Sequence, residues 1–494
     1  MEFKKLVKNT SYLAGTRFVK FFAGIIRSKL NAIYLGTEGV GIVGQFLMMI
    51  KTSSGFTTLG MNEAVVKQIA KNSNSADSKK IIASSIKTYL ITISLFVLIS
   101  TIILLVFRNV ITEYVFGSIK YSKIFYLVIF TFPILIINGV FFAILNGFKA
   151  IKHIASARIG IIISNIIIFI PLVVVFKLKG AIVYLPISFL VTLAWNFYFS
   201  YKYYLKPNEL NFSSIINAPI KSDFQNEMLI FSGYGLVVGL MALFSIFIGR
   251  SIVVTHLGID KIGIYSPIIT WAGLFTGFLL PSFNTYLFPR FSEVKTNQEA
   301  TGIINDALRL ASLSLLPLLL LAIPFRFILI KAFYSSEFLE AANYLPYHFL
   351  GVVFNVWFVI FGQTMTPRGF IKQHSIFKFI FYSMSLSLAY LLVPKMGLQG
   401  WMLKFFISYV FLFAMSYLFL RIKTEFKISK ENVTLMLYLL ISTVILILLE
   451  YLFDSNFIGM ILGPIMLLFT YFLLKNNEKD FFQNKILLLI RKFR

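Results

Sequence analysis

The sequence predicts an all-α polytopic membrane protein with about 14 transmembrane helices, arranged as two six-helix lobes and an additional helix pair. Three observations predict this class. Of 494 residues, 58% are hydrophobic and only 13% are charged, and the mean hydropathy is +0.83. Apolar stretches of about 18 residues or more, each long enough to cross the hydrocarbon layer, recur along the whole chain. An internal repeat divides most of the chain into two halves.

Most of the predicted spans are strongly apolar. They run from Ile81 to Val106, Ile124 to Leu145, Ile159 to Phe176, Ala181 to Tyr201, Leu229 to Val254, Leu308 to Ile330, Phe349 to Thr364, Ile376 to Val393, Trp401 to Leu420, Val433 to Phe453 and Phe457 to Leu474. The others contain more polar residues and run from Ser11 to Ile33, Gly39 to Ala70 and Ile262 to Phe288.

The distribution of lysine and arginine predicts the orientation. Basic residues gather at the N-terminus, in alternate loops and in the C-terminal tail, which places both termini in the cytoplasm. The net charge of +26 is therefore interpreted as charge that faces anionic membrane lipids, and no nucleic-acid-binding motif accompanies it. The tail, residues 480–494, has the pattern of a basic amphipathic helix on the inner surface. The first apolar stretch carries Arg17, Lys20 and Arg27, so we expect it to remain as a helix and not to be cleaved as a signal peptide.

The repeat has an offset of about 222 residues. It pairs Gly36 with Gly258 and Gly41 with Gly263, and "GAIVYLPIS" aligns with "GWMLKFFIS" after a small shift. Each half contains an even number of spans, so both enter the membrane in the same orientation and a pseudo-two-fold axis along the membrane normal relates them. We therefore expect an N-terminal lobe over 1–210, a C-terminal lobe over 222–425, an additional helix pair over 430–475 and the tail over 480–494.

A G-x-G-x-x-G motif occupies Gly39 to Gly44. A dinucleotide-binding turn would need a buried strand before it, a helix after it and an acidic residue about 20 positions further on, and this chain lacks that context. The glycines are better interpreted as a small-residue face where two membrane helices approach closely.

Helical spacing places cations together on one face. In the first span Arg17, Lys20 and Arg27 lie within an arc of about 80°, which also holds Gly24 and Asn31. Polar side chains at such depth must face protein or water. The candidate binding residues for an anionic substrate are therefore Arg27, Lys51, Arg250, Lys20, Arg17, Asn62 and Asn284.

Other interpretations of these residues are open. The cations could form structural ion pairs or reach the membrane surface, as we expect for Lys29, Lys87 and Lys404. Asn62 and Asn284 could instead be interhelical hydrogen-bonding residues.

The pattern as a whole resembles a transporter superfamily. The chain resembles the multidrug/oligosaccharidyl-lipid/polysaccharide (MOP) exporter superfamily in the order of its motifs. These are a basic residue late in the first span, then L-G-x-E-x-V-G, then "GFTTLGMNEAVVKQIAK" and its echo in the second half. Within it, the chain most resembles the polysaccharide branch, the O-antigen (Wzx-type) flippases. The resemblance covers about the first 425 residues.

The resemblance implies a MATE-like fold and a flippase that moves undecaprenyl-diphosphate-linked oligosaccharide to the outer leaflet of the bacterial cytoplasmic membrane by alternating access. Arg27 corresponds to an arginine of the related lipid II flippases, because it stands at the same distance before Gly36. The resemblance also implies a functional monomer, with other polysaccharide assembly proteins as partners.

Two alternatives are a MATE-like drug/cation antiporter and a membrane-embedded glycan polymerase or glycosyltransferase. The scarcity of carboxylates inside the spans disfavours the antiporter, and short outer loops disfavour the enzymes. We expect no cofactor, metal or catalytic site, because cysteine is absent and four histidines are scattered through the chain.

Overall fold

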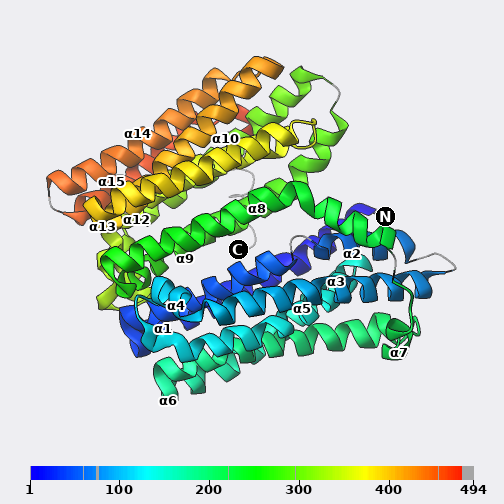
Figure 1. The fold of residues 1–494 in the computed structure, drawn as a ribbon. Coiled ribbons are helices and arrows are strands. Elements are labelled where there is room, and N and C mark those ends of the chain that lie inside the picture. Colours follow the sequence, from blue (N-terminus) through cyan, green and yellow to red (C-terminus); the bar gives the residue numbers. More distant parts are fainter. Residues whose placement is uncertain are drawn as a thin grey trace, which may run out of the picture. The chain divides into compact units, whose positions relative to one another are not determined.

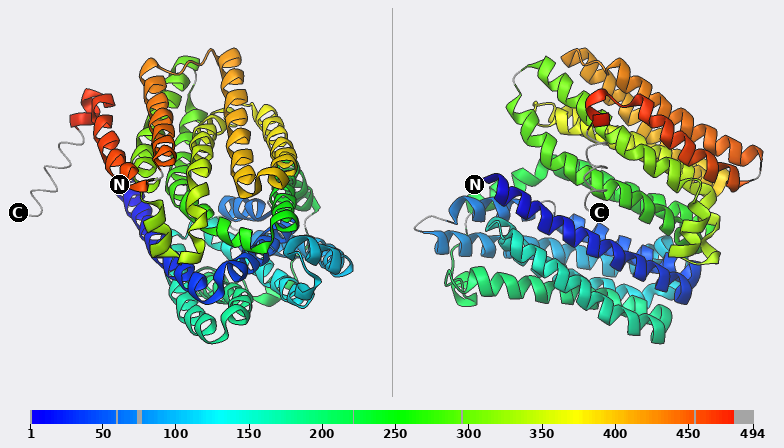
Figure 2. Two further views of the ribbon diagram at one scale, coloured as in Figure 1. Left: turned by 90° about the vertical axis from the view of Figure 1, so that its left-hand side faces the viewer. Right: turned by 180° about the vertical axis from the view of Figure 1, so that it is seen from behind.

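The computed structural model describes residues 2–480, except 59, 60, 74–76, 221, 295 and 454. Figures 1 and 2 show that the described chain is built from helices and connecting loops. The first half contains α1 (Glu2–Thr58), α2 (Met61–Asn72), α3 (Ser78–Val106), α4 (Arg108–Phe116), η1 (Ile119–Ile124), α5 (Phe125–Gly147), α6 (Ile151–Ser200), η2 (Tyr201–Leu205) and α7 (Phe212–Ile216). The second half contains α8 (Ser222–Leu257), α9 (Ile259–Glu293), α10 (Asn297–Ala322), α11 (Arg326–Phe333), η3 (Ser336–Phe338), α12 (Glu340–Met365), α13 (Ile371–Thr424), α14 (Lys430–Leu452), α15 (Asn456–Phe469) and η4 (Thr470–Leu473).

The described residues contain 11 helical segments that are long and apolar enough to cross a membrane. Three of these segments are unusually long and contain a residue with non-helical backbone angles: Gly36 in α1, Lys177 in α6 and Gly397 in α13. Counting each broken segment as two spans gives the number that the sequence predicts. The membrane-protein class is confirmed, while the count of about 14 remains a prediction.

The helix breaks recur in both halves of the chain. Residues with left-handed backbone angles occur at Gly36, Lys149 and Lys177, and again about 220 residues later at Gly258, Gly369 and Gly397. After the last break of each set, a glycine lies against a carbonyl eight residues before it. A Cβ atom would lie 1.8 Å from the Leu172 oxygen at Gly180 and 2.4 Å from the Leu392 oxygen at Gly400. The symmetry between the predicted lobes, and their boundaries, remain predictions.

The helices form two compact units. The first holds the chain up to Ser266 together with Phe333–Phe338 and Tyr382–Gly400, and the second holds Pro267–Ala332, Leu339–Phe381 and the described residues from Trp401 onward. Within the first unit, α6 packs against both α1 and α5. Within the second unit, α10 packs against α12, α14 and α15.

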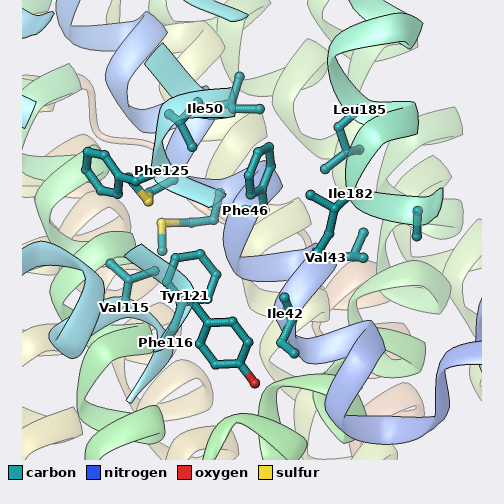
Figure 3. Packing of buried hydrophobic residues seen from close by; sticks show 14 of the residues in the cluster. Ile42, Val43, Phe46, Ile50, Val115, Phe116, Tyr121, Phe125, Ile182 and Leu185 are labelled. Atoms are coloured by element: carbon teal, nitrogen blue, oxygen red, sulfur yellow. The ribbon is translucent and has the colours of Figure 1, made fainter. Parts of the chain in front are cut away.

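An apolar core fixes the part of α1 that follows Gly36. Phe46 and Ile50 lie one helical turn apart and are buried against Val115 of α4, Phe125 of α5 and Leu185 of α6. Figure 3 shows these side chains packed together from several helices. This packing sets the rotation of α1 about its axis, and therefore which of its residues face away from the core.

Ion pairs join the additional helix pair, and the segment that follows it, to other helices of the second unit. Arg309 of α10 forms two hydrogen bonds to Glu478, from Nε at 2.5 Å and from Nη2 at 2.7 Å. Arg326 of α11 pairs with Glu450 of α14, and its Nη2 atom donates to Asn456 of α15 at 3.1 Å. These carboxylates are among the few that lie near the apolar stretches, and their partners come from helices far away in sequence.

Candidate functional site

Two helices bring predicted cations together in the first unit. Lys20 and Arg27 lie before the break at Gly36, Lys51 lies after it in the same α1, and Arg250 lies in α8. Because Gly36 has φ +63, a backbone region that favours glycine, the chain reverses there and the two parts of α1 can meet.

Lys51 is the centre of this group. Arg250, Lys20 and Arg27 each lie near enough to its ammonium group for the charges to repel each other. The Lys51 side chain is exposed although it lies inside a candidate span, and its neighbours Ile50 and Thr52 are buried. The structure therefore brings together four of the seven predicted site residues, which we call the Lys51 cluster.

Each arginine of the Lys51 cluster has a neutral hydrogen-bond acceptor. Arg27 Nη1 donates to the hydroxyl of the buried Tyr184 at 3.3 Å. Arg250 Nη1 donates to the Gly44 carbonyl at 3.2 Å and to the Gln45 side-chain oxygen at 3.4 Å. Among the residues that the structure describes, no carboxylate pairs with any member of the cluster.

Arg17 has a neighbour that the sequence interpretation missed. Arg158, near the beginning of α6, lies close enough to Arg17 for the two charges to repel each other. Arg158 falls in a basic segment whose sequence is typical of a surface loop. Only the packing of α1 against α6 reveals that Arg158 lies near Arg17. The cationic surface of α1 therefore extends from Lys51 toward its N-terminal part.

Of the two predicted asparagines, only Asn62 has a side chain within the described part of the protein. Asn62 in α2 accepts a hydrogen bond of 2.5 Å from the hydroxyl of Tyr89 in α3, and its oxygen also lies beside Gly139 in α5. This geometry is that of an interhelical hydrogen bond, the second interpretation open for Asn62. The side chain of Asn284 lies outside the described part of the protein.

Three lysines were expected to reach the membrane surface. Lys29 donates to the Tyr334 carbonyl at 2.5 Å, and Lys87 donates to the carbonyls of Ile216 and Ala218. For Lys404 the expectation is wrong, because the side chain is only 7% exposed and its Nζ atom lies 3.8 Å from the centroid of the Trp401 ring. The aromatic ring compensates part of the cost of burying this charge.

The glycine motif marks a close helix crossing. A Cβ atom at Gly41 would lie 2.2 Å from the carbonyl oxygen of Ile259, and one at Gly263 would lie 1.9 Å from that of Thr37. Real Cβ atoms do not approach so closely, so both positions require glycine in this arrangement. The interpretation of Gly41 as a packing residue is confirmed, and we call this contact the Gly41–Gly263 crossing.

The Lys51 cluster can attract and hold a multiply charged anion. Four cations that lack carboxylate partners among the described residues create a positive potential within the candidate membrane spans. Arginine matches the geometry of phosphate oxygens, and lysine adds a mobile point charge. Within the described ranges, no group of three histidine, aspartate or glutamate side chains could hold a metal ion.

Comparisons with known sequences identify a family and two relatives. Residues 6–295 match the profile of the family described as "Polysaccharide biosynthesis protein". The chain is 24% identical over 377 residues to a protein of Shigella flexneri described as an O-antigen transporter, covering 74% of this chain and 86% of that protein. It is 20% identical over 427 residues to the lipid III flippase of Escherichia coli (strain K12), covering 83% and 97%.

Solved structures share the fold. An inward-facing multidrug resistance MATE family transporter of the MOP superfamily matches with a TM-score of 0.70 and 15% identity, covering 83% of this chain and 94% of that chain. The lipid II flippase MurJ in an inward closed conformation matches with a TM-score of 0.69 and 14% identity, covering 97% and 100%. The predicted MATE-like fold class is thereby confirmed.

Proposed function

Because the chain belongs to the polysaccharide biosynthesis protein family, we propose that it is a flippase for undecaprenyl-diphosphate-linked oligosaccharide. It moves an O-antigen or related surface polysaccharide repeat unit from the inner to the outer leaflet of the bacterial cytoplasmic membrane by alternating access. The observation that carries this proposal is the Lys51 cluster, whose exposed lysine and surrounding cations lie inside a membrane-spanning fold. The relatives named as an O-antigen transporter and a lipid III flippase support the substrate class.

The proposed substrate fits the cluster chemically. A diphosphate carries about two negative charges, which hydrocarbon excludes, so a translocator must offer cations along the path. Arg27 and Arg250 can exchange their neutral acceptors for phosphate oxygens, since hydrogen bonds between ionised groups are stronger than those to neutral acceptors. Lys20, Arg17 and Arg158 extend the positive surface along α1 and α6.

The proposed orientation places both termini in the cytoplasm, because the basic loops and tail then face the cytoplasm. In this orientation the Gly41–Gly263 crossing lies toward the outer side, beyond Lys51. The protein functions as a monomer, and other polysaccharide assembly proteins consume the glycan that it delivers. No catalytic step is required for this activity.

The test is to identify the intermediate that accumulates when the gene is deleted. An undecaprenyl-diphosphate-linked repeat unit, trapped in the inner leaflet and cleared when the intact gene is restored, is the expected result. Normal surface polysaccharide together with increased drug sensitivity would instead indicate an antiporter. Translocated but unpolymerised repeat units would indicate a polymerase.

A further inference from the structure

Gln45 is a completely buried amide that links three helices. Its Nε2 atom donates to the Val115 carbonyl of α4 at 2.7 Å, and its Oε1 atom accepts from Arg250 of α8 at 3.4 Å. A buried amide without partners would cost on the order of 1–3 kcal/mol, so these bonds specify where the side chain points. The bond to α4 fixes the Gln45 oxygen in front of the Arg250 guanidinium.

Arg250 is held by neutral acceptors close to a further cation. It donates to Gly44 and Gln45, which are both neutral acceptors. Lys51 follows Gly44 by two turns of the same helix, and it lies within electrostatic reach of Arg250. Hydrogen bonds to an ionised acceptor are about twice as strong as those to neutral ones, so a phosphate near Lys51 competes successfully for the same N–H groups.

The acceptors of Arg250 adjoin the Gly41–Gly263 crossing. Gly44 lies one helical turn after Gly41, and a Cβ atom at Gly44 would lie 3.9 Å from Ile262, the residue before Gly263. The bonds from Arg250 therefore reinforce the same contact between α1 and the segment formed by α8 and the beginning of α9. Losing these bonds weakens that contact.

We propose that Gln45 is a positioning residue that keeps Arg250 docked on α1 until an anion at the Lys51 cluster draws the guanidinium away and loosens the Gly41–Gly263 crossing. This inference rests on the proposed function, because it supplies the step by which the bound diphosphate opens the protein toward the outer side of the membrane. It assigns to Gln45 an effect on conformation that depends on the presence of an anion.

The test measures a distance across the crossing in the purified full chain. The sequence has no cysteine, so spin labels can be attached at Ile33→Cys and Thr255→Cys, two exposed positions that precede Gly36 and Gly258 by three residues. Inorganic pyrophosphate is the probe for the diphosphate. In the otherwise unchanged protein, we expect pyrophosphate to convert a short label distance into a longer one.

Two substitutions at Gln45 have opposite expected effects. Gln45→Leu removes one of the two acceptors of Arg250 and leaves only the Gly44 carbonyl, so we expect the longer distance to be populated without pyrophosphate. Gln45→Glu places a carboxylate beside Arg250, so the short distance persists and about tenfold more pyrophosphate or greater is needed for the same change. Gln45→Met preserves the size of the side chain but also lacks the amide oxygen, so we expect it to give the same result as Gln45→Leu. Lys51→Ala abolishes the response to pyrophosphate but leaves the effect of Gln45→Leu intact.

A merely structural role would shift all Gln45 variants in the same direction, and this result would overturn the proposal. An absence of any pyrophosphate response in the unchanged protein would also overturn it. A parallel assay of lipid-linked glycan translocation in vesicles separates the two hypotheses. If translocation is absent while the label distances respond as expected, the proposed function fails and the role of Gln45 stands. If translocation occurs but the Leu and Glu variants do not diverge, the role of Gln45 fails alone.

Discussion

Gly41 and Gly263 make reciprocal contacts at one helix crossing. Gly41 lies against the carbonyl of Ile259, and Gly263 lies against the carbonyl of Thr37. The two glycines are separated by the offset of the internal repeat, and so are the two residues that supply the carbonyls. The crossing is therefore self-complementary, as expected where equivalent segments of two repeats meet around a local two-fold axis.

Replacing either glycine by alanine should destabilise the protein. A Cβ atom would overlap a backbone oxygen, which cannot rotate away as a side chain can, so the helices must separate at a cost of about 1–3 kcal/mol. The melting temperature in detergent measures this effect. Gly302→Ala is the matched control, because no atom lies within 4 Å of the added Cβ and alanine is the better helix former. Equal melting temperatures for Gly41→Ala and the control would contradict the close contact.

Removing cations from the Lys51 cluster should abolish export. Arg27→Ala and Lys51→Ala each remove one charge that the proposed diphosphate needs, while the protein still inserts in the membrane. Surface polysaccharide in a deletion strain that carries each variant measures the effect. Arg27→Lys separates charge from bidentate geometry, because lysine retains the first and lacks the second. Lys29→Ala is the control, since Lys29 bonds to the Tyr334 carbonyl outside the cluster. Normal export by both alanine variants would disprove the cationic site.

The sequence predicts helix positions well because membrane spans need long apolar stretches, and the small residues of Gly39 to Gly44 predict a close helix approach there. That Gly263 supplies the other side of this contact appears only in the structure. The prediction for Lys404 is wrong because a lysine near a helix end normally reaches water, whereas the Nζ atom of Lys404 lies 3.8 Å from the centroid of the Trp401 ring. The docking of Arg250 on Gly44 and Gln45 depends on contacts between helices far apart in sequence. Helical spacing within one segment contains no information about such contacts.

Acid should weaken the attachment of the additional helix pair. Burial raises the pKa of Glu478, but hydrogen bonds from Arg309 and from the Lys475 backbone outweigh this and lower the pKa below its usual value. A lowered folded-state pKa means that the stabilisation is complete above about pH 4.3, the unfolded value, and is lost as the pH falls through the folded-state value. Melting temperatures measured across this range should fall more steeply for the unchanged protein than for Glu478→Gln. Parallel pH profiles of the two proteins would argue against the linkage.

The second ion pair of this region allows a sharper test of how the additional pair is held. Arg326 and Glu450 are 7% and 6% exposed, and the carboxylate of Glu450 lies beside Gly459 of α15. Glu450→Gln leaves the buried guanidinium without its counter-charge, so we expect a loss of about 3–5 kcal/mol in the free energy of unfolding.

The double variant Arg326→Met with Glu450→Gln should recover most of this loss, because a buried ion pair contributes little net stability once both charges are removed. Unfolding in denaturant, followed by tryptophan fluorescence, gives the free energies for both single variants and the double variant. If the losses of the single variants simply add in the double variant, the two residues do not act as a pair. Recovery in the double variant would show that charge compensation, and not packing of either side chain alone, joins α14 and α15 to α11.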